Sequence, residues 1–324
     1  MYERIITHND FDGIVSAAIC AHVLSIRSLR FVGPRAITES RIFTTRNDVV
    51  CDLPYPLECG LWFDHHEGNV EELKYRGVDP EQVEGAFALL PSCSRVVYNY
   101  FSGTQNLPDR FEKMVQEADV IDTFGYQNIE EWRKETPGKI VEGTLKVEDR
   151  KAKEQQRYMT GLVLQLKDRP LDQVAQLAEV RERYKKFLEE ESRMIQQIHD
   201  NAHFLPEDEH QELVILDLTR YNRKPSLVKH LAYFLFPEAL GVIEIKNLFQ
   251  REIKTNNLSL SMSLSLNLNG SDHKKDVGEI MRILNIGDGH KGAGAGVVRC
   301  SSKDEMVKRK ESILRQIYQI WRTQ

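Results

Sequence analysis

Short apolar runs that each stop at an acidic residue or a histidine constrain the fold more than any other feature of this sequence. Three of them lie in the first 65 residues and lead into His8, Asp52 and Asp64. The runs are Arg4–Thr7, Asp48–Cys51 and Leu61–Phe63. Between the first two, Ile14–Leu24 has the apolar spacing of a helix packed on a sheet. Strands that alternate with helices predict a parallel, doubly wound α/β sheet.

A long helical region is expected after this sheet. Ser94–Phe101 and Pro108–Val120 have helical patterns, and the segment 147–202 is dense in Lys, Arg, Glu and Gln with apolar residues at helical spacing. Only Pro170 interrupts that segment. We interpret it as long helices whose charged residues form a solvated face.

A second, smaller α/β domain is predicted beyond residue 205. Leu213–Leu218 and Ala239–Ile245 are strand-like, and Ser226–Phe236 between them is helical. Leu258–Leu268 alternates apolar and polar residues as a half-buried strand does, and Val277–Leu284 is a helix leading into the Gly-rich run IGDGHKGAGAG. The expected organisation is a first domain at 1–150, a helical linker at 151–204 and a second domain at 205–324.

Composition excludes several classes of protein. The net charge of −5 offers no basic face for duplex DNA, although a bound metal ion can still attract a short anionic ligand. No apolar run approaches the roughly 20 residues that span a bilayer, and the first residues do not resemble a secretory signal. The five cysteines form no C-x-x-C pair, which favours reduced thiols. We therefore predict a cytoplasmic protein without a membrane partner.

The residues that follow the strands are of the kinds that bind divalent metal ions. Because the carboxyl ends of parallel strands meet at one rim of a sheet, these side chains are expected to converge. Crowded carboxylates repel one another unless cations lie between them, and oxygen ligands with a few imidazoles suit manganese or magnesium. Taken singly, Asp10 and Asp52 are equally typical of helix caps and turns. The candidates are His8, Asp10, Asp12, Asp52, Asp64, His65, His66, Asp119 and Asp122.

In their order, these motifs resemble those of the DHH phosphoesterase superfamily. The matching segments are THNDFDG at 7–13, the isolated Asp52, DHH at 64–66 and ADVID at 118–122. The run GDGHKGAGAG at 287–296 resembles the G-x-G-H-x-x-A-x-G motif of the DHH-associated C-terminal domain. The resemblance spans almost the whole chain and implies a metal-binding catalytic domain followed by a substrate-binding domain.

The family pattern implies a site for two Mn²⁺ ions, with Mg²⁺ as the alternative. His8 and Asp10 would hold one ion and Asp52 would bridge to the other. Asp12 and His65 would belong to the second ion. In this pattern a water activated by both ions attacks phosphorus as a hydroxide.

The fourth motif and the DHH tripeptide supply the remaining roles that the resemblance implies. Asp119 or Asp122 would complete the second metal site, and Asp119 is favoured because ADV matches the nuclease-like form of this motif. His66 would contact the scissile phosphate, and Asp64 would orient a histidine. His66 and Asp64 are therefore the predicted catalytic residues.

The Gly-rich run is the predicted substrate-binding element, since Gly-rich turns cradle phosphates with backbone amides. The candidate contacts are Gly287, Gly289, His290, Lys291 and Gly292. Two departures from the family leave the substrate open. Asp288 stands within the glycine run, and the preceding strand, Ser263–Asn267, lacks the arginine that pairs with a terminal phosphate in related enzymes.

The resemblance implies a metal-dependent phosphohydrolase that acts on a small nucleotide, a short single-stranded oligonucleotide or a related phosphate compound. The relevant members are oligoribonucleases, pAp phosphatases and exopolyphosphatase-related proteins, so nanoRNA, pAp, dinucleotides and polyphosphate all stay candidate substrates. The alternative is a regulatory protein that keeps the fold and binds a nucleotide without turnover. Family resemblance also suggests a homodimer.

Overall fold

The computed structural model describes residues 2–147, 149, 151–223, 225, 227–251, 253–268 and 273–324. The chain divides into two compact units. The first consists of Met1–Gly125 and Glu135–Leu188, and the second of Tyr126–Lys134 and Glu189–Gln324. Among the described residues, no helix has both the length and the apolar character needed to cross a membrane.

The first unit is built on a five-stranded sheet in which all strands run parallel, in the order β2-β1-β3-β4-β5. This confirms the predicted fold class. The strands are β1 (Arg4–Thr7), β2 (Ser28–Phe31), β3 (Asp48–Cys51), β4 (Leu61–Asp64) and β5 (Gly85–Phe87). The three central strands are the apolar runs seen in the sequence. β2 and β5 were not predicted because, as half-exposed edge strands, they lack a continuous apolar run.

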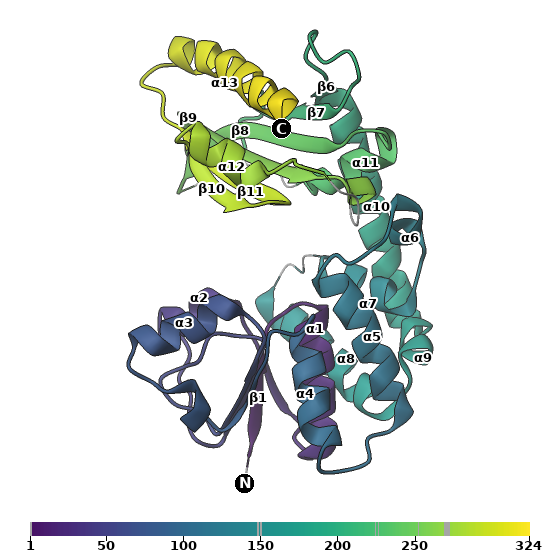
Figure 1. Cartoon of the computed structure of the whole chain (residues 1–324). Coiled ribbons are helices and arrows are strands. Elements are labelled where there is room, and N and C mark those ends of the chain that lie inside the picture. Colours follow the sequence, from purple (N-terminus) through teal and green to yellow (C-terminus); the bar gives the residue numbers. More distant parts are fainter. Residues whose placement is uncertain are drawn as a thin grey trace. The chain divides into compact units, whose positions relative to one another are not determined.

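Helices cover both faces of this sheet (Figure 1). One face packs against α1 (Phe11–Val23), α4 (Cys93–Ser102), α5 (Asp109–Asp122) and α8 (Ala152–Asp168). The other face, through Val50 and Trp62, packs against Ile37 of α2 (Pro34–Thr38) and Leu73 of α3 (Glu67–Tyr75). The helical region continues with α7 (Pro137–Leu145), α9 (Leu171–Ala175) and α10 (Ala178–Asn201). The sheet is thus buried on both faces, which explains its uninterrupted apolar strands.

The second unit contains a mixed six-stranded sheet in the order β10-β11-β9-β8-β7-β6. Its strands are β6 (Ala202–His203), β7 (Leu213–Asp217), β8 (Gly241–Gln250), β9 (Ile253–Leu264), β10 (Gly287–His290) and β11 (Ala293–Val298). One face packs against α12 (Val277–Ile283) and α13 (Lys303–Thr323). The other face packs against α6 (Ile129–Arg133) and the short helix α11 (Ala232–Leu235).

Two predicted elements of this unit need correction. The alternating run 258–268 is a strand only as far as Leu264, because Leu266–Leu268 forms a 3-10 turn. The helix predicted at 226–236 is reduced to a 3-10 turn at Lys229–Leu231 followed by α11, and residue 226 lies outside the described residues. In both places the apolar pattern persists through a turn that packs on the sheet.

Candidate metal centre

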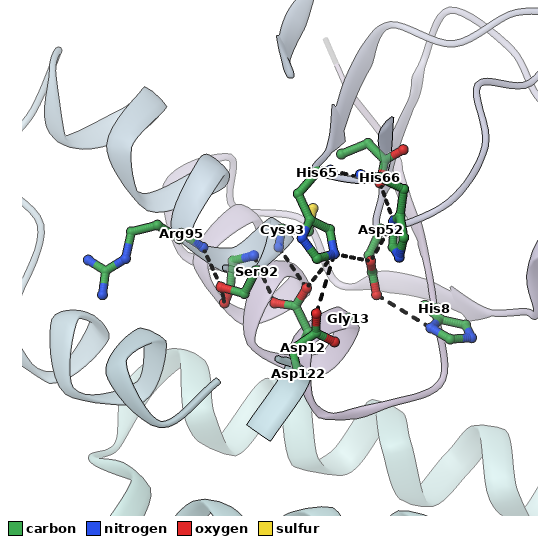
Figure 2. A network of polar contacts seen from close by, with 12 residues as sticks. His8, Asp12, Gly13, Asp52, His65, His66, Ser92, Cys93, Arg95 and Asp122 are labelled. Atoms are coloured by element: carbon green, nitrogen blue, oxygen red, sulfur yellow. Dashed lines mark hydrogen bonds and ion pairs between the residues drawn. The ribbon is translucent and has the colours of Figure 1, made fainter. Parts of the chain in front are cut away.

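The carboxyl ends of three neighbouring strands bring ligand-type side chains to one rim of the first sheet (Figure 2). His8 directly follows β1, Asp52 follows β3, and Asp64 ends β4. The register of the strands aligns Thr7 with Cys51 and Cys51 with Phe63, so the residues that follow them lie side by side. The convergence that the sequence predicts is therefore present in the fold.

The first turn of α1 adds two more carboxylates to this rim. Asp10 caps the helix and accepts a hydrogen bond from the Gly13 amide at 2.9 Å. A Cβ at Gly13 would lie 2.4 Å from the His8 carbonyl oxygen, so only glycine allows α1 to start so close to β1. The buried Asp12 carboxylate accepts hydrogen bonds from the Cys93 and Ser94 amides, at 2.7 and 2.8 Å. The N-terminus of α4 thus fixes its orientation.

Asp52 and His65 present buried polar atoms that are unsatisfied by the described part of the chain. Neither carboxylate oxygen of Asp52 has a hydrogen bond of good geometry there, its nearest cationic group being His8 Nδ1 at 3.4 Å, and His65 Nε2 likewise has no hydrogen-bond partner. His65 Nδ1 lies 3.0 Å from the Leu90 carbonyl oxygen, which leaves Nε2 facing the carboxylates, 3.7 Å from Asp52 and 3.5 Å from Asp122. Asp52 adopts the left-handed backbone conformation, with φ 57°, that Asp and Asn tolerate better than other residues with a side chain.

The potential ligand atoms fall into three overlapping groups. His8, Asp10 and Asp52 form one group, and Asp12, His65 and Asp122 form another. In the third group Asp52 and His65 lie together with His66, and within each group the ligand atoms are all within 4.8 Å of one another. Asp52 and His65 therefore belong to two groups each. This is the arrangement that two cations sharing ligands would require.

The protonation equilibria of these groups reflect uncompensated negative charge. Burial, with the carboxylates of Asp10 and Asp122 nearby, raises the pKa of Asp12 to about 7. Burial and the Asp12 carboxylate raise the pKa of Asp52 well above its usual value, and burial likewise raises the pKa of Asp122. Burial opposes the charge of His8, yet Asp10 and Asp52 raise its pKa to about 10. The site concentrates negative charge that a cation would neutralise.

The residues present fit divalent metal ions. Their donor set is carboxylate oxygen with imidazole nitrogen, which suits manganese or magnesium better than a thiolate-preferring metal. The buried thiol of Cys93 lies nearby but donates to the Phe63 carbonyl oxygen, and burial raises its pKa well above the usual value. A cavity of about 370 Å³ adjoins the site, lined among others by Asp10, Asp12 and Asp122. A small anionic group has room to approach there.

The structure reverses the preference between the two acidic residues of the fourth motif. Asp119 is turned away from the cluster: it accepts hydrogen bonds from Ser92 Oγ at 2.6 Å and from Arg95 at 2.7 and 3.0 Å. Asp122, one helical turn later, lies among the potential ligands. For this geometric reason we propose Asp122, rather than the favoured Asp119, as the metal ligand.

Asp64 and His66 form a hydrogen-bonded pair beside the cluster. The fully buried Asp64 carboxylate lies 2.8 Å from His66 Nδ1 and accepts a hydrogen bond from the His65 amide at 2.9 Å and from Asn69 at 2.5 Å. The hydrogen bond to Asp64 raises the pKa of His66. The His66 side chain is 52% exposed, so its other face is accessible to a ligand. These positions match the roles predicted for the pair, which stay predictions.

Comparison with known proteins identifies solved structures that share the fold of this chain. No family model and no curated protein sequence matches the chain. Among solved structures, the pGpG-specific phosphodiesterase PggH from Vibrio cholerae has a TM-score of 0.74 and 22% identity, over 98% of this chain and 99% of that one. The DHH domain of a protein described as a member of a ribosomal protein family has a TM-score of 0.56 and 14% identity, over 98% and 86%. This chain has the fold of these DHH-domain structures.

A more distant structure with the same fold carries a metal ion. The exonuclease RecJ bound to manganese has a TM-score of 0.52 and 10% identity, over 98% of this chain and 90% of that one. At such identities the likeness concerns the fold alone. The metal site of this DHH-fold chain is therefore argued from its own residues.

The predicted substrate-binding run of the DHH-fold chain is an exposed antiparallel hairpin of β10 and β11. Gly287, Gly289 and His290 lie on β10, and Lys291 and Gly292 form its turn. Arg282 donates to the Asp288 carboxylate at 2.8 Å and also to Glu279, so it offsets only part of the negative charge here.

Sequence reasoning missed several residues that hold the site. Ser92 caps α4, accepting from the Arg95 amide, and thereby positions the two amides that bind Asp12. The carbonyl of Leu90 orients His65. The serine could have been found, since Ser before an apolar helical run is a common N-cap. The direction of a backbone carbonyl group cannot be predicted from the identity of the residue that carries it.

Proposed function

We propose that this protein is a metal-dependent phosphodiesterase that cleaves a linear dinucleotide or a comparably short oligonucleotide. One observation carries the proposal: buried atoms of Asp52 and His65 that no described residue satisfies, at the centre of three overlapping ligand groups. The likeness to PggH, described as pGpG-specific, supports the choice of a dinucleotide.

In this proposal each side chain has a separate task. His8, Asp10, Asp12, Asp52, His65 and Asp122 hold two divalent ions. When bound, such ions lower the pKa of water and stabilise negative charge on a phosphoryl group. Asp64 holds His66 through Nδ1, so that Nε2 donates to a phosphate oxygen. Because its pKa is raised, His66 keeps its proton, and hence its positive charge, at higher pH than an ordinary histidine.

The second unit offers a cation near the strand that lacks the expected arginine. The ammonium group of Lys229 donates to Ser261 Oγ on β9, and His230 Nε2 lies 3.0 Å from Ser263 Oγ on the same face of the sheet. Burial lowers the pKa of Lys229 to about 8. We propose that Lys229 takes the place of the missing arginine and binds a substrate phosphate.

Lys229→Met is expected to raise KM at least ~10-fold, about 1.4 kcal/mol of lost binding, with kcat changed by less than about threefold. As pH rises through 8, the wild-type lysine loses its charge and KM should rise, whereas the variant should show no such rise. Steady-state kinetics from pH 6.5 to 9.5 measure both effects. Lys308→Met, an exposed lysine of α13, is the control. An unchanged KM in Lys229→Met would show that Lys229 does not bind the substrate phosphate.

The proposed function is tested by release of mononucleotide from pGpG, pApA and a pentaribonucleotide, and by release of phosphate from pAp and short polyphosphate. Each is assayed with Mn²⁺, with Mg²⁺ and with chelator, beside His65→Ala. Metal-dependent cleavage of the dinucleotides, lost in His65→Ala, is the expected result. Turnover of pAp or polyphosphate alone would contradict the proposed substrate. Tight binding of a nucleotide without turnover of any substrate would indicate that the protein is a nucleotide sensor and not an enzyme.

A further inference from the structure

The second unit contains a cavity of about 830 Å³ that neither the metal centre nor the Gly-rich hairpin accounts for. It lies where the carboxyl end of β7, the β8–β9 hairpin, the end of α10 and the first half of α13 meet. The Gly-rich hairpin is at the other end of the sheet, since Ala293 pairs with Ser263 opposite the start of β8. Asn247 at the cavity is five residues further along β8 than Val242, the partner of Ser263, and so lies about 17 Å from it.

Four cationic side chains line this cavity, against two carboxylates. They are Arg220, Lys254, Lys303 and Lys310, with Asp200 and Asp217 as the acidic residues. Lys310 donates to Asp217 and Arg220 lies near Asp200, so these four charges offset one another. Two ammonium groups are left over. The wall of the cavity therefore has an excess of positive charge in a protein whose net charge is −5.

The two remaining cations, Lys254 and Lys303, line the same cavity. Lys254 donates to the Thr219 carbonyl oxygen at 2.7 Å, and burial together with the positive charge of Lys303 lowers its pKa. Within the described residues, no carboxylate forms an ion pair with Lys254 or Lys303. Two like charges without a counterion are unfavourable, and an anion bound between them would relieve that cost.

A buried amide on the cavity wall indicates a second kind of contact. Asn247 is 3% exposed, and its Nδ2 donates to the Thr255 carbonyl oxygen at 2.8 Å and lies 3.2 Å from the sulfur of Met306. Its Oδ1 has no hydrogen-bond partner in the described part of the chain. A buried acceptor without a donor is costly, and a rotation of this side chain toward the cavity would let an N–H or O–H group of a ligand satisfy it. Met306 and Val307 give the same wall an apolar stretch.

We infer that this cavity is a binding site for a phosphorylated small molecule of nucleotide size. Its phosphate lies between Lys254 and Lys303, and a hydrogen-bond donor of its organic part reaches Asn247. The volume falls in the range of about 300–1,000 Å³ that is usual for small-molecule sites. The site lies wholly in the second unit and does not depend on the function proposed for the metal centre.

Isothermal titration calorimetry of the full chain in EDTA, which silences the metal centre, tests this site. The probes are GMP, guanosine and inorganic phosphate. We expect GMP to bind more tightly than guanosine or inorganic phosphate. Lys303→Glu and Lys254→Ala should each weaken GMP binding at least ~10-fold. Lys308→Ala, on an exposed part of α13 outside the cavity, should leave the affinity unchanged. Asn247→Leu should reduce the ratio of the GMP affinity to the phosphate affinity.

Three outcomes would overturn the inference. The first is the absence of measurable heat with every probe up to millimolar concentration. The second is GMP binding that Lys303→Glu leaves intact, which would place the ligand elsewhere. The third is equal and weak binding of phosphate and GMP, which would show an adventitious ion only. Because Lys303 is exposed, its variant is expected to fold normally, so a lost affinity is interpretable.

Discussion

Asp52→Asn is expected to abolish metal-dependent turnover while it stabilises the metal-free protein. Asp52 lies in one ligand group with His8 and Asp10, and its carboxylate is 3.7 Å from His65 Nε2, so its loss weakens both proposed ion sites. A fall of at least ~10³-fold in kcat/KM, about 4 kcal/mol, is the scale of a lost ligand at a metal-assisted reaction. Asparagine is the appropriate replacement because it tolerates the φ of 57° at this position, where alanine would add backbone strain.

The gain in stability follows from the raised pKa values. Burial and nearby carboxylates raise the pKa of Asp52 well above its usual value and that of Asp12 to about 7. The folded state therefore holds these protons more tightly than the unfolded state, and metal-free stability falls as pH rises from about 4 to 7 and beyond. Replacing one of these carboxylates by an amide makes the fall in stability with pH smaller. The variant should therefore become more stable than the wild type by an amount that grows with pH.

Thermal unfolding at pH 5 and pH 8, with chelator and with Mn²⁺, measures this prediction. In chelator at pH 8 the variant should be about 1 kcal/mol more stable, roughly 2–4 °C in Tm, with a smaller difference at pH 5. Mn²⁺ at 100 times its Kd should stabilise the wild type by about 2.7 kcal/mol and the variant far less. A variant that is less stable in chelator and still responds fully to Mn²⁺ would contradict a cation site at Asp52.

The sequence predicted the part of the fold that is buried on both sides. β1, β3 and β4 are continuous apolar runs because helices cover both faces of the sheet, and the parallel topology then implies that His8, Asp52 and Asp64 share a rim. Edge strands gave no such signal. In the second unit, the alternating pattern continued past Leu264 because the following 3-10 turn again buries an apolar residue, Leu266. Local patterns predict which residues are buried, and not where a strand ends.

Orientation about a helix axis was the main feature of the site that the sequence did not determine. Asp119 and Asp122 are three residues apart on α5, so both lie toward the same side of the helix. The ion pair that draws Asp119 away comes from Arg95 on α4, a contact between helices that packing creates. Similarly, Lys229 reaches β9 from a turn more than 30 residues earlier. Such contacts depend on tertiary structure.

Asp122→Asn and Asp119→Asn are expected to have opposite profiles. Asp122 Oδ2 lies 3.5 Å from His65 Nε2 in one of the ligand groups, so its loss should lower kcat/KM by about 10²–10³-fold, or ~3–4 kcal/mol, and weaken Mn²⁺ binding. Asp119 instead accepts hydrogen bonds from Arg95 and Ser92. Its loss should cost about 1–3 kcal/mol of stability, because a partly buried guanidinium loses one of its two charged partners.

Turnover at saturating Mn²⁺ and unfolding in chelator separate the two variants. Asp119→Asn should keep kcat/KM within about fivefold, ~1 kcal/mol, since Glu112 still pairs with Arg95 at 3.0 Å and Ser92 still caps α4. Asp122→Asn should be at least as stable as the wild type in chelator, because burial raises the pKa of the carboxyl that it removes. If Asp119→Asn loses Mn²⁺ binding and Asp122→Asn retains it, α5 presents its other aspartate to the metal, and the ligand set proposed from this geometry is wrong.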